Sequence, residues 1–504
     1  MSKTIKINNN EYWFAGVTGD GCFMPFSVES KYEVSLTKSN KFNQASSMLI
    51  STTGRVVYAK EADIKIKDGA ITVYSDNLIE EQKAGTTLKD AYSYISKNYF
   101  TLNGKTPPSD FFMYPQFNDW MKVGHNQTQE KVLDYAKEII KSGYPYKILM
   151  IDDKWSDYYG SFEFNARRFP DPKGMIDELH KSGFKIILWE TPYISPDSEE
   201  FRELSDLDGL VKNADGSVAI RKWWNGYSAV LDLSNSKTVS WLRKKNALLL
   251  GLGVDGFKFD GGDTDMYAFG DKNHASFTPC EMNKQYSLFA SGYEYSEMRS
   301  SFNCGGLPLV QRQSDKMHSW DEEGIKKLVP SLIVQSLFGY AYSCPDMVGG
   351  GNILDINGDI DEELFIRYAE CSALMPMMQF SKLPCEILSE KANAIVKKYA
   401  NLHTEVAEYI FNLAKDFALT GKPICRCLEY EFPKQNFESE MQAFMLGEKY
   451  LVAPVLKKGQ RKKTIRLPDG CKWKYVPENA IHNGGETVTV NADIEILPFF
   501  ERLT

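Results

Sequence analysis

The segment VDGFKFDGGD (residues 254–263) joins an apolar strand pattern to two carboxylates. The two glycines that follow Asp260 predict a loop rather than a helix. Such an aspartate either caps the next helix or ends a parallel strand, which is where barrel enzymes hold reactive groups. Lys258 favours the second interpretation, because it lies two residues before Asp260 and points to the same side of the strand. Its charge would keep the Asp260 carboxylate ionised, as a nucleophile requires.

Acidic, cationic and tryptophan side chains also follow other apolar segments. These residues are Asp152, Asp153, Trp189, Trp224, Arg312, Asp315, Trp320 and Asp346. Tryptophan faces stack on the C–H groups of sugars, while carboxylates accept hydrogen bonds from sugar hydroxyls. Any one of these tryptophans could equally belong to the core. Their recurrence at successive strand ends favours a carbohydrate site.

The elements that would position these residues fall into three parts. Short β-prone runs separated by Gly, Asn and Asp predict an antiparallel β-sandwich over residues 1–105. Between residues 106 and 426, strands alternate with amphipathic helices, which predicts an α/β fold with a (β/α)8 TIM barrel. Residues 427–504 predict a small C-terminal β-sandwich domain. Within the barrel we expect strands at 111–114, 148–151, 185–189 and 254–260, and helices at 129–141, 175–181 and 238–250.

The composition limits the possible partners. The 504 residues carry a net charge of −8 and are 43% hydrophobic, which is enough to bury a large core. The absence of a long basic run disfavours nucleic acid, and the absence of a long apolar run disfavours a membrane partner. The N-terminal residues lack the apolar core of a signal peptide, and the nine cysteines lack paired spacing. We therefore expect a cytoplasmic protein with reduced thiols, which could form a homo-oligomer.

Several segments together resemble glycoside hydrolase family 31, whose members are retaining α-glycosidases. The segment MIDDKW (150–155) is similar to the second-strand block of that family, and FKFD (257–260) is similar to its nucleophile strand. Asp315 followed by Trp320 resembles the acid/base block, although His318 stands where the family has serine. PDMVGG (345–350) and the segments FMLG (444–447) and VAPV (452–455) resemble later blocks. Within the family, the sequence is most similar to the branch of the myogenesis-regulating glycosidase and bacterial α-galactosidases.

The resemblance implies a mechanism with two carboxylates and no cofactor. A retaining glycosidase uses one ionised carboxylate as nucleophile and one protonated acid to assist the leaving group. We assign these roles to Asp260 and Asp315, respectively. A small oligosaccharide or glycoside would be the substrate. The expected substrate-binding residues are Asp152, Asp153, Trp189, Trp224, Lys258, Arg312, Trp320 and Asp346, with Asp346 expected to position the others.

Alternatives remain open at this stage. Asp321 could be the acid instead of Asp315, although acids at 321–323 are also ordinary first-turn residues of a helix. A catalytic metal is disfavoured, because no strand end combines a histidine with the carboxylates. The glycone could be α-galactose, α-glucose or sulfoquinovose. A catalytically silent sugar-binding protein is the alternative from another class, and the presence of both carboxylates disfavours it.

Overall fold

A sheet of eight parallel strands forms the centre of the protein, and the computed structural model describes residues 1–503. These strands are β9 (Gln116–Asn118), β10 (Ile148–Ile151), β11 (Lys185–Glu190), β15 (Gly256–Phe259), β16 (Tyr295–Met298), β18 (Val310–Arg312), β19 (Ser343–Cys344) and β20 (Gln379–Phe380). Neighbours follow chain order, and β20 pairs with β9. A parallel bridge between Met347 and Gln379 links the remaining edge. The sheet is therefore a nearly closed barrel, which confirms the predicted fold class.

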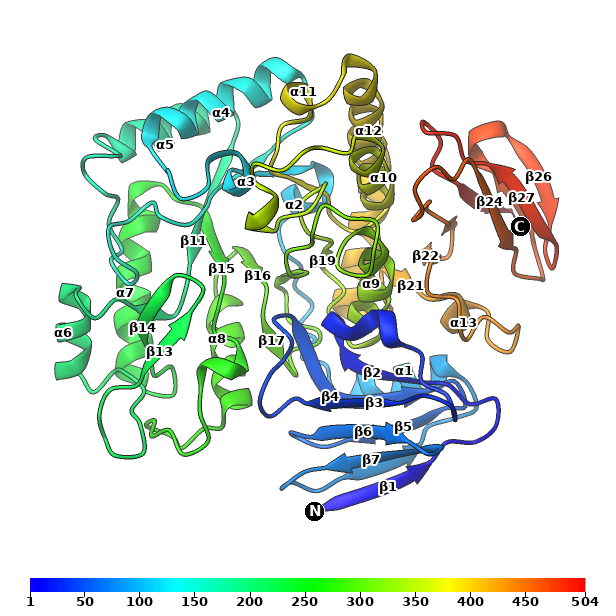
Figure 1. The fold of residues 1–504 in the computed structure, drawn as a ribbon, viewed down its shortest axis with the longest axis horizontal. Helices are drawn as coiled ribbons and strands as arrows, with labels where there is room; N and C mark the ends of the chain where they lie inside the picture. The colour runs from blue at the N-terminus through cyan, green and yellow to red at the C-terminus, as the bar shows by residue number, and fades with distance from the viewer. Residues whose placement is uncertain (504) are drawn as a thin grey trace.

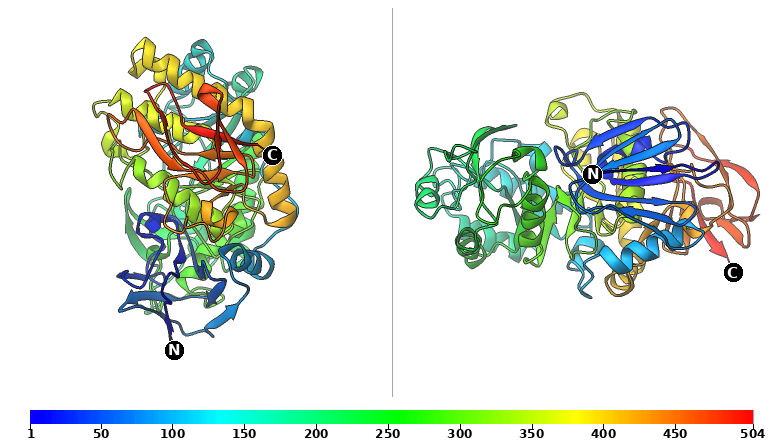
Figure 2. Two further views of the ribbon diagram at one scale, coloured as in Figure 1. Left: turned by 90° about the vertical axis from the view of Figure 1, so that its right-hand side faces the viewer. Right: turned by 90° about the horizontal axis from the view of Figure 1, so that it is seen from below.

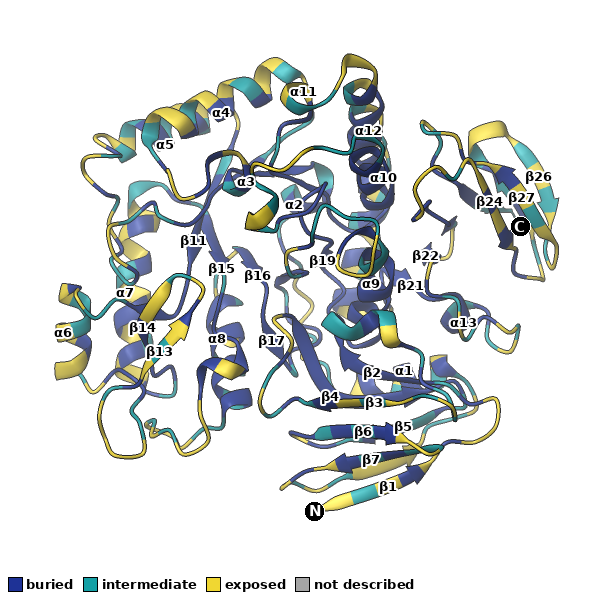
Figure 3. Cartoon of the chain, in the orientation of Figure 1, coloured by how far each residue is buried: buried dark blue, intermediate teal, exposed yellow. Residues whose placement is uncertain are grey.

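Helices cover the outside of the barrel (Figure 1). They include α4 (Gln129–Ser142), α5 (Pro172–Lys181), α7 (Ser236–Leu252), α8 (Pro279–Ala290), α9 (Leu328–Leu337), α10 (Glu362–Ala373) and α12 (Glu390–Thr420). In α4, Thr128 caps the first turn, Val132, Tyr135 and Ile139 are buried at helical spacing, and left-handed Gly143 ends the helix. The outer faces of such helices are exposed, whereas the barrel strands are buried (Figure 3). The helices predicted at 129–141, 175–181 and 238–250 are confirmed.

The strand predicted at 111–114 is wrong. These residues lie in the short helix α2 (Asp110–Met113), and the first barrel strand begins later, at Gln116. Phe111 and Phe112 are fully buried, and the Phe112 ring packs against Phe411 of α12 with centroids 5.5 Å apart. An apolar run of this length has the same pattern in a buried strand and in a buried helical turn, so periodicity alone does not distinguish the two.

Two sheets form the N-terminal part. The first contains β1 (Ser2–Lys6), β7 (Ala70–Tyr74), β6 (Asp63–Lys67) and β3 (Tyr32–Ser35), and the second contains β2 (Trp13–Val17), β4 (Gln44–Ser51), β5 (Arg55–Tyr58), β8 (Glu80–Lys83) and β17 (Ser301–Phe302). Strand β17 comes from the barrel region and pairs in parallel with β4. The N-terminal sheets are thereby joined to the chain just after the fifth barrel strand. Figure 2 shows the N-terminal part, in blue, beside the rest of the chain from two further sides.

The C-terminal part has a core of its own. A six-stranded sheet contains β21 (Cys425–Arg426), β22 (Phe444–Leu446), β23 (Tyr450–Val452), β28 (Phe499–Leu503), β25 (Lys472–Tyr475) and β26 (Ala480–Asn483). The pair β24 (Lys462–Arg466) and β27 (Thr487–Asn491) forms a second, two-stranded sheet. Buried Trp473, Tyr475 and Phe500 pack with Ile465 of β24 in one apolar cluster. The hydrophobic effect of this cluster stabilises the small domain.

Smaller elements complete the chain. They are α1 (Leu88–Tyr99), α3 (Trp120–Val123), α6 (Glu199–Asp206), α11 (Pro384–Ile387), α13 (Leu428–Glu431) and a three-stranded sheet of β12 (Tyr193–Ile194), β14 (Gly226–Val230) and β13 (Ile220–Trp223). The nine cysteines are unpaired thiols in this structure, and most of them are buried. Among residues 1–503, no helix combines the length and the apolar character needed to cross a bilayer.

Candidate active site

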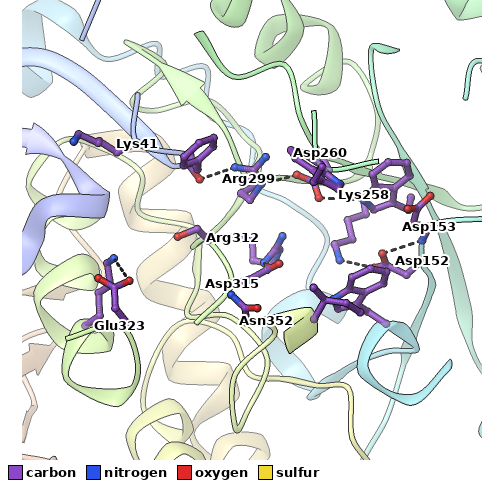
Figure 4. Close-up of a pocket in the computed structure, with 17 residues that line it drawn as sticks. Lys41, Asp152, Asp153, Lys258, Asp260, Arg299, Arg312, Asp315, Glu323 and Asn352 are labelled. Carbon is purple, nitrogen blue, oxygen red and sulfur yellow. Dashed lines mark hydrogen bonds and ion pairs between the residues drawn. The ribbon is translucent and has the colours of Figure 1, made fainter. Parts of the chain in front are cut away.

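A cavity of about 400 Å³ opens where the barrel strands end. Its lining residues include Lys41, Phe42, Trp120, Asp152, Asp153, Trp189, Trp224, Lys258, Asp260, Arg299, Arg312, Ser314, Asp315, Glu323, Lys327, Asn352 and Ile353. Figure 4 shows the charged members of this set around one hollow. The volume suits a small-molecule ligand, and side chains of both charges converge on it. Most of the residues that the sequence singled out therefore lie together.

Asp260 follows β15 and has three hydrogen-bond donors. Arg299 Nε lies 2.5 Å from Asp260 Oδ1, and Trp189 Nε1 donates to Oδ2 at 3.1 Å. The backbone N–H of Gly261 donates to Oδ1 at 2.8 Å. Only 13% of the Asp260 side chain is exposed, so these donors replace most of its contact with water.

The pKa of the Asp260 carboxyl group is lowered. Burial by itself raises this pKa, but the positive charges of Arg299, Arg312 and Lys258 outweigh the burial and hold the pKa well below its usual range. The carboxylate is therefore ionised across the physiological pH range. An ionised and oriented carboxylate at a cavity wall is chemically able to attack an electrophilic carbon.

Lys258 forms its direct ion pair with Asp152 and not with Asp260. Its ammonium group lies 2.5 Å from Asp152 Oδ2, and both side chains are at least 96% buried. Asn118 Nδ2 donates to the same oxygen at 2.9 Å. Lys258 thus neutralises Asp152 directly and acts on Asp260 only through its charge. The charge of Lys258 helps to keep Asp260 ionised, as the sequence predicted, but Arg299 and Arg312 contribute more, and Arg299 makes the direct contact.

Asp153, the second acid after β10, is held by neutral donors. Tyr159 Oη donates to Asp153 Oδ2 at 3.1 Å, and Asn225 Nδ2 donates to the same atom at 2.6 Å. His125 Nε2 lies 3.5 Å from this oxygen. Asn225 belongs to the turn between β13 and β14, so the small sheet after β11 closes this side of the cavity.

Arg312 and Asp315 also line the cavity. Arg312 is the last residue of β18, and Asp315 follows it by three residues. Arg312 Nη1 contacts Asp315 Oδ1 at 2.6 Å and Asp346 Oδ1 at 3.3 Å, and Arg312 Nε lies 3.3 Å from Glu297 Oε1. One guanidinium thus serves three carboxylates. Burial first, and then the charge of Asp315, raise the pKa of Asp346 to about 6. Asp346 therefore holds a proton more readily than an isolated aspartate does.

Asp346 lies behind the cavity rather than on its wall. It is buried, adopts a left-handed φ of 92°, and accepts hydrogen bonds from the backbone N–H groups of Lys316 and Gly351. These contacts fix the segment that carries Asp315. Asp346 does not line the described cavity, as a substrate-binding residue would.

The three tryptophans differ in position. Trp189 is nearly buried beside Asp260, whereas Trp224 is 51% exposed at the rim, where the Arg299 guanidinium lies 5.5 Å from its ring centroid. Trp320 does not line this cavity. Its Nε1 donates to Asp361 Oδ2 at 2.9 Å, and its ring lines a different groove next to the C-terminal domain. The expectation that Trp320 binds substrate in this cavity is therefore not supported by its position, because the hydrogen bond to Asp361 holds its ring at the other groove.

The acids at 321–323 do not begin a regular helix. They lie in a turn before the 3-10 turn Ile325–Lys327, and Asp321 Oδ1 accepts hydrogen bonds from Ser319 Oγ and the Glu323 backbone N–H. Asp321 is exposed and does not line the cavity, whereas Glu323 does. Its side chain is 75% exposed and lies 3.6 Å from Lys327. Among these acids, position favours Glu323 over Asp321 as a competitor of Asp315.

The main residue that the sequence analysis missed is Arg299. It follows the fifth strand, β16, and it also contacts Asp263 Oδ2 through Nη2 at 2.8 Å. The segment YSEMR (295–299) is too polar to stand out as a barrel strand. Strand counting could have found it, because an eight-stranded barrel requires a strand between the Asp260 strand and the Arg312 strand.

The N-terminal loop residues at the cavity were also missed. Gln44 Nε2 donates to the backbone carbonyls of Arg299 and Arg312 at 2.6 and 2.8 Å. The Phe42 carbonyl accepts a hydrogen bond from Arg299 at 2.7 Å, and Asn43 exchanges two hydrogen bonds with Ser314. The N-terminal domain thus holds the ends of two barrel strands. No local pattern in the sequence predicts a contact between residues more than 250 positions apart.

The described residues contain no cluster of three His, Cys, Asp or Glu side chains arranged to hold a metal ion. A parallel barrel with a cavity at its strand ends, lined by tryptophans and by charges of both signs, is typical of barrel proteins that bind carbohydrates. The model of the glycosyl hydrolases family 31 TIM-barrel domain matches residues 111–413, and that of the family's C-terminal domain matches residues 421–503. The chain therefore belongs to glycosyl hydrolase family 31.

Individual relatives agree with this assignment. The myogenesis-regulating glycosidase of Mus musculus is 29% identical over 403 residues, which cover 77% of this chain and 56% of that protein. Alpha-glucosidase 2 of Bacillus thermoamyloliquefaciens is 24% identical and is matched over 85% of this chain and 59% of its own length. The chain thus spans little more than half the length of these relatives. A Flavobacterium johnsoniae GH31 dextranase complexed with glucose has the same fold, with a TM-score of 0.83 at 18% identity over 99% of this chain and 66% of that one.

The buried pair of Lys258 and Asp152 gives a stability prediction. Lys258→Met leaves the Asp152 carboxylate buried without its cation, so we expect a loss of about 3–5 kcal/mol in the free energy of unfolding. The double variant Lys258→Met/Asp152→Asn removes both charges and should recover most of this loss. Urea unfolding of the two variants and the unaltered protein measures the effect. Equal destabilisation of both variants would contradict the pairing.

Proposed function

We propose that this protein is an exo-acting retaining α-glycosidase that releases a terminal α-linked hexose, with α-galactose as the favoured glycone. The observation that carries the proposal is the ionised Asp260 carboxylate on the wall of a small cavity that also contains Asp315. Family membership supports the reaction class. The resemblance of residues 257–260 and 345–350 to the α-galactosidase branch supports the glycone.

In the proposed reaction, an oxygen of Asp260 attacks the anomeric carbon while a carboxylic acid protonates the glycosidic oxygen. The bond from the sugar to Asp260 forms as the bond to the leaving group breaks. Water then attacks the same carbon, loses its proton to the second carboxylate and releases Asp260. Two inversions retain the anomeric configuration. Arg299 and Trp189 orient Asp260, while Asp152, Asp153, Lys258 and Trp224 contact the sugar.

Asp315 is our choice of proton donor, because it lines the same cavity as Asp260 and because its segment resembles the acid/base block of the family. Glu323 is the second candidate, because it lines the same cavity and has greater exposure. The residue that protonates the glycosidic oxygen matters most for poor leaving groups. The dependence of the rate on the leaving group therefore distinguishes Asp315 from Glu323 as the donor.

The alternative glycones have specific support. An α-glucoside fits the name of one reported relative. A sulfoquinovoside requires additional cations, and Lys41 and Lys327 line the cavity beside the arginines. A silent sugar-binding protein would use the same cavity without turnover. A homo-oligomer remains a prediction.

Substrate identity is tested with p-nitrophenyl α-glycosides of galactose, glucose, xylose, N-acetylgalactosamine and sulfoquinovose. We expect fastest hydrolysis of the galactoside, because of the branch resemblance. Asp260→Asn should abolish turnover and leave the thermal unfolding profile intact, since the amide keeps the shape but cannot act as nucleophile. Faster hydrolysis of another glycoside would refute only the choice of galactose as the glycone. Activity that survives in Asp260→Asn would refute the assignment of Asp260 as the nucleophile.

The proton donor is tested with leaving groups of different acidity. Asp315→Ala should reduce kcat/KM on alkyl glycosides by about 10²–10⁴-fold and on activated aryl glycosides much less, because good leaving groups need no proton. Glu323→Ala is the matched variant and should affect both substrate types similarly. If Glu323→Ala shows the leaving-group dependence and Asp315→Ala does not, the roles are reversed.

The pH profile tests the cation that acts on Asp260. Arg299 lowers the pKa of Asp260, so its removal raises that pKa and protonates the carboxylate at higher pH. We expect Arg299→Gln to shift the acidic limb of the kcat/KM profile upward by about one unit or more. Lys245→Gln removes a cation on the outer helix α7 and should leave the limb in place. An unshifted limb in Arg299→Gln would contradict the account.

A further inference from the structure

A second hollow lies between the barrel and the C-terminal domain, and its lining residues differ from those of the cavity that contains Asp260. It has a volume of about 690 Å³. Its lining residues include Trp320, Lys326, Gln442, Leu456, Lys457, Lys458, Gln460, Lys463 and Thr464. Among these described lining residues there are four lysines and no acid. This lysine groove therefore has a positive potential in a chain whose net charge is −8.

The local sequence explains the charge. The segment KKGQRKK (457–463) places five cations within seven residues, a basic concentration that the sequence analysis did not recognise. Nearby acids satisfy some of them, since Lys458 pairs with Asp361 and Arg461 pairs with Glu363. Within residues 1–503, Lys457 and Lys463 have no carboxylate oxygen within 4 Å. Positive charge in the groove is thus only partly compensated by the protein itself.

Lys463 is the deepest of the lysines. It is 9% exposed, and its ammonium group donates to the Pro454 carbonyl at 3.0 Å. Burial lowers the pKa of the Lys463 ammonium group. Glu440 acts on Lys463 only through its charge, without an ion pair within 4 Å, and a bound anion would favour the charged form by direct contact.

Trp320 is fixed in the groove by the same carboxylate that holds Lys458. Asp361 Oδ2 accepts hydrogen bonds from Trp320 Nε1 at 2.9 Å and from Lys458 Nζ at 2.7 Å, and Asp361 Oδ1 accepts one from the Leu364 backbone N–H at the start of α10. The ring and one lysine are therefore anchored to a helix cap. An aromatic ring beside amide and hydroxyl groups suits a sugar ring, and the cations suit its acidic substituents.

We propose that the lysine groove is a binding site for an acidic polysaccharide with carboxylate or sulfate groups, separate from the catalytic cavity. Trp320 would stack on a sugar ring, Lys457 and Lys463 would pair with the acidic groups, and Gln442 and Gln460 would bind hydroxyls. Nucleic acid suits the groove less well, because its phosphates need a broad basic surface and the lysines here are confined to one groove.

The groove also adjoins the catalytic cavity. The segment 314–327 separates them, with Asp315, Glu323 and Lys327 lining the cavity and Trp320 and Lys326 lining the groove. A polymer bound in the groove would lie against the segment that carries Asp315. The groove would thus hold an acidic glycan close to the proposed site of hydrolysis.

The test measures binding of polymers to the full chain that carries Asp260→Asn. This variant cannot hydrolyse the polymer during the measurement. Binding is therefore judged separately from the proposed glycosidase activity. Polygalacturonate and dextran sulfate are titrated by calorimetry at physiological salt, with neutral dextran as comparison. We expect binding of an acidic polymer and none of neutral dextran. Lys457→Glu should weaken that binding about tenfold or more. Trp320→Ala should weaken it too, by removing the stacking surface.

Lys462→Glu is the matched control, because it reverses the same charge in the same segment but does not line the groove. If Lys457→Glu and Lys462→Glu weaken polymer binding equally, the polymer is held by general electrostatic attraction. That result would refute the proposed binding site. Comparable binding of duplex DNA, binding of inorganic phosphate alone, or no binding of either acidic polymer would also overturn it. Thermal unfolding checks each variant, and Lys457→Gln replaces Lys457→Glu if the latter does not fold.

Discussion

The central physical constraint is that a nearly buried carboxylate must stay charged. Burial favours the neutral form of Asp260, and only the surrounding positive charges reverse this preference. Arg299 provides the direct contact, while Arg312 and Lys258 act through space. Each of these cations would itself be costly to bury alone. Further carboxylates offset this cost, because Asp152, Asp263 and Asp315 each pair with one of the three cations.

The architecture supplies this set by two means. Parallel strands bring their carboxyl ends to one edge of the barrel, so residues distant in sequence meet without long loops. The N-terminal domain then fixes two of those ends, because Gln44 bonds the backbone at both Arg299 and Arg312. The pairing of β17 with β4 continues this contact directly after Arg299. The flanking domain is thus a structural part of the cavity.

Sequence patterns were sufficient for the barrel and for about half of the residues that line the cavity. Apolar strands that end near Asp152, Trp189, Asp260 and Asp315 can be recognised locally in the sequence. The barrel then brings these four side chains to one cavity. Arg299 was missed because its strand is polar, and Phe42 because its contact joins distant parts of the chain. Trp320 was misplaced because its orientation depends on Asp361, which follows it by 41 residues. The aromatic run at 111–114 formed a helix because burial alone does not select a strand.

The central claim, that Asp260 is the nucleophile of a retaining α-glycosidase, is tested most directly by trapping the covalent intermediate. The protein is incubated with 5-fluoro-α-galactosyl fluoride or its glucosyl counterpart, and intact mass and peptide mapping follow. The account predicts a gain of one glycosyl unit, located on Asp260 and absent from Asp260→Asn. An adduct on another carboxylate, or hydrolysis that inverts the anomeric configuration, would contradict it.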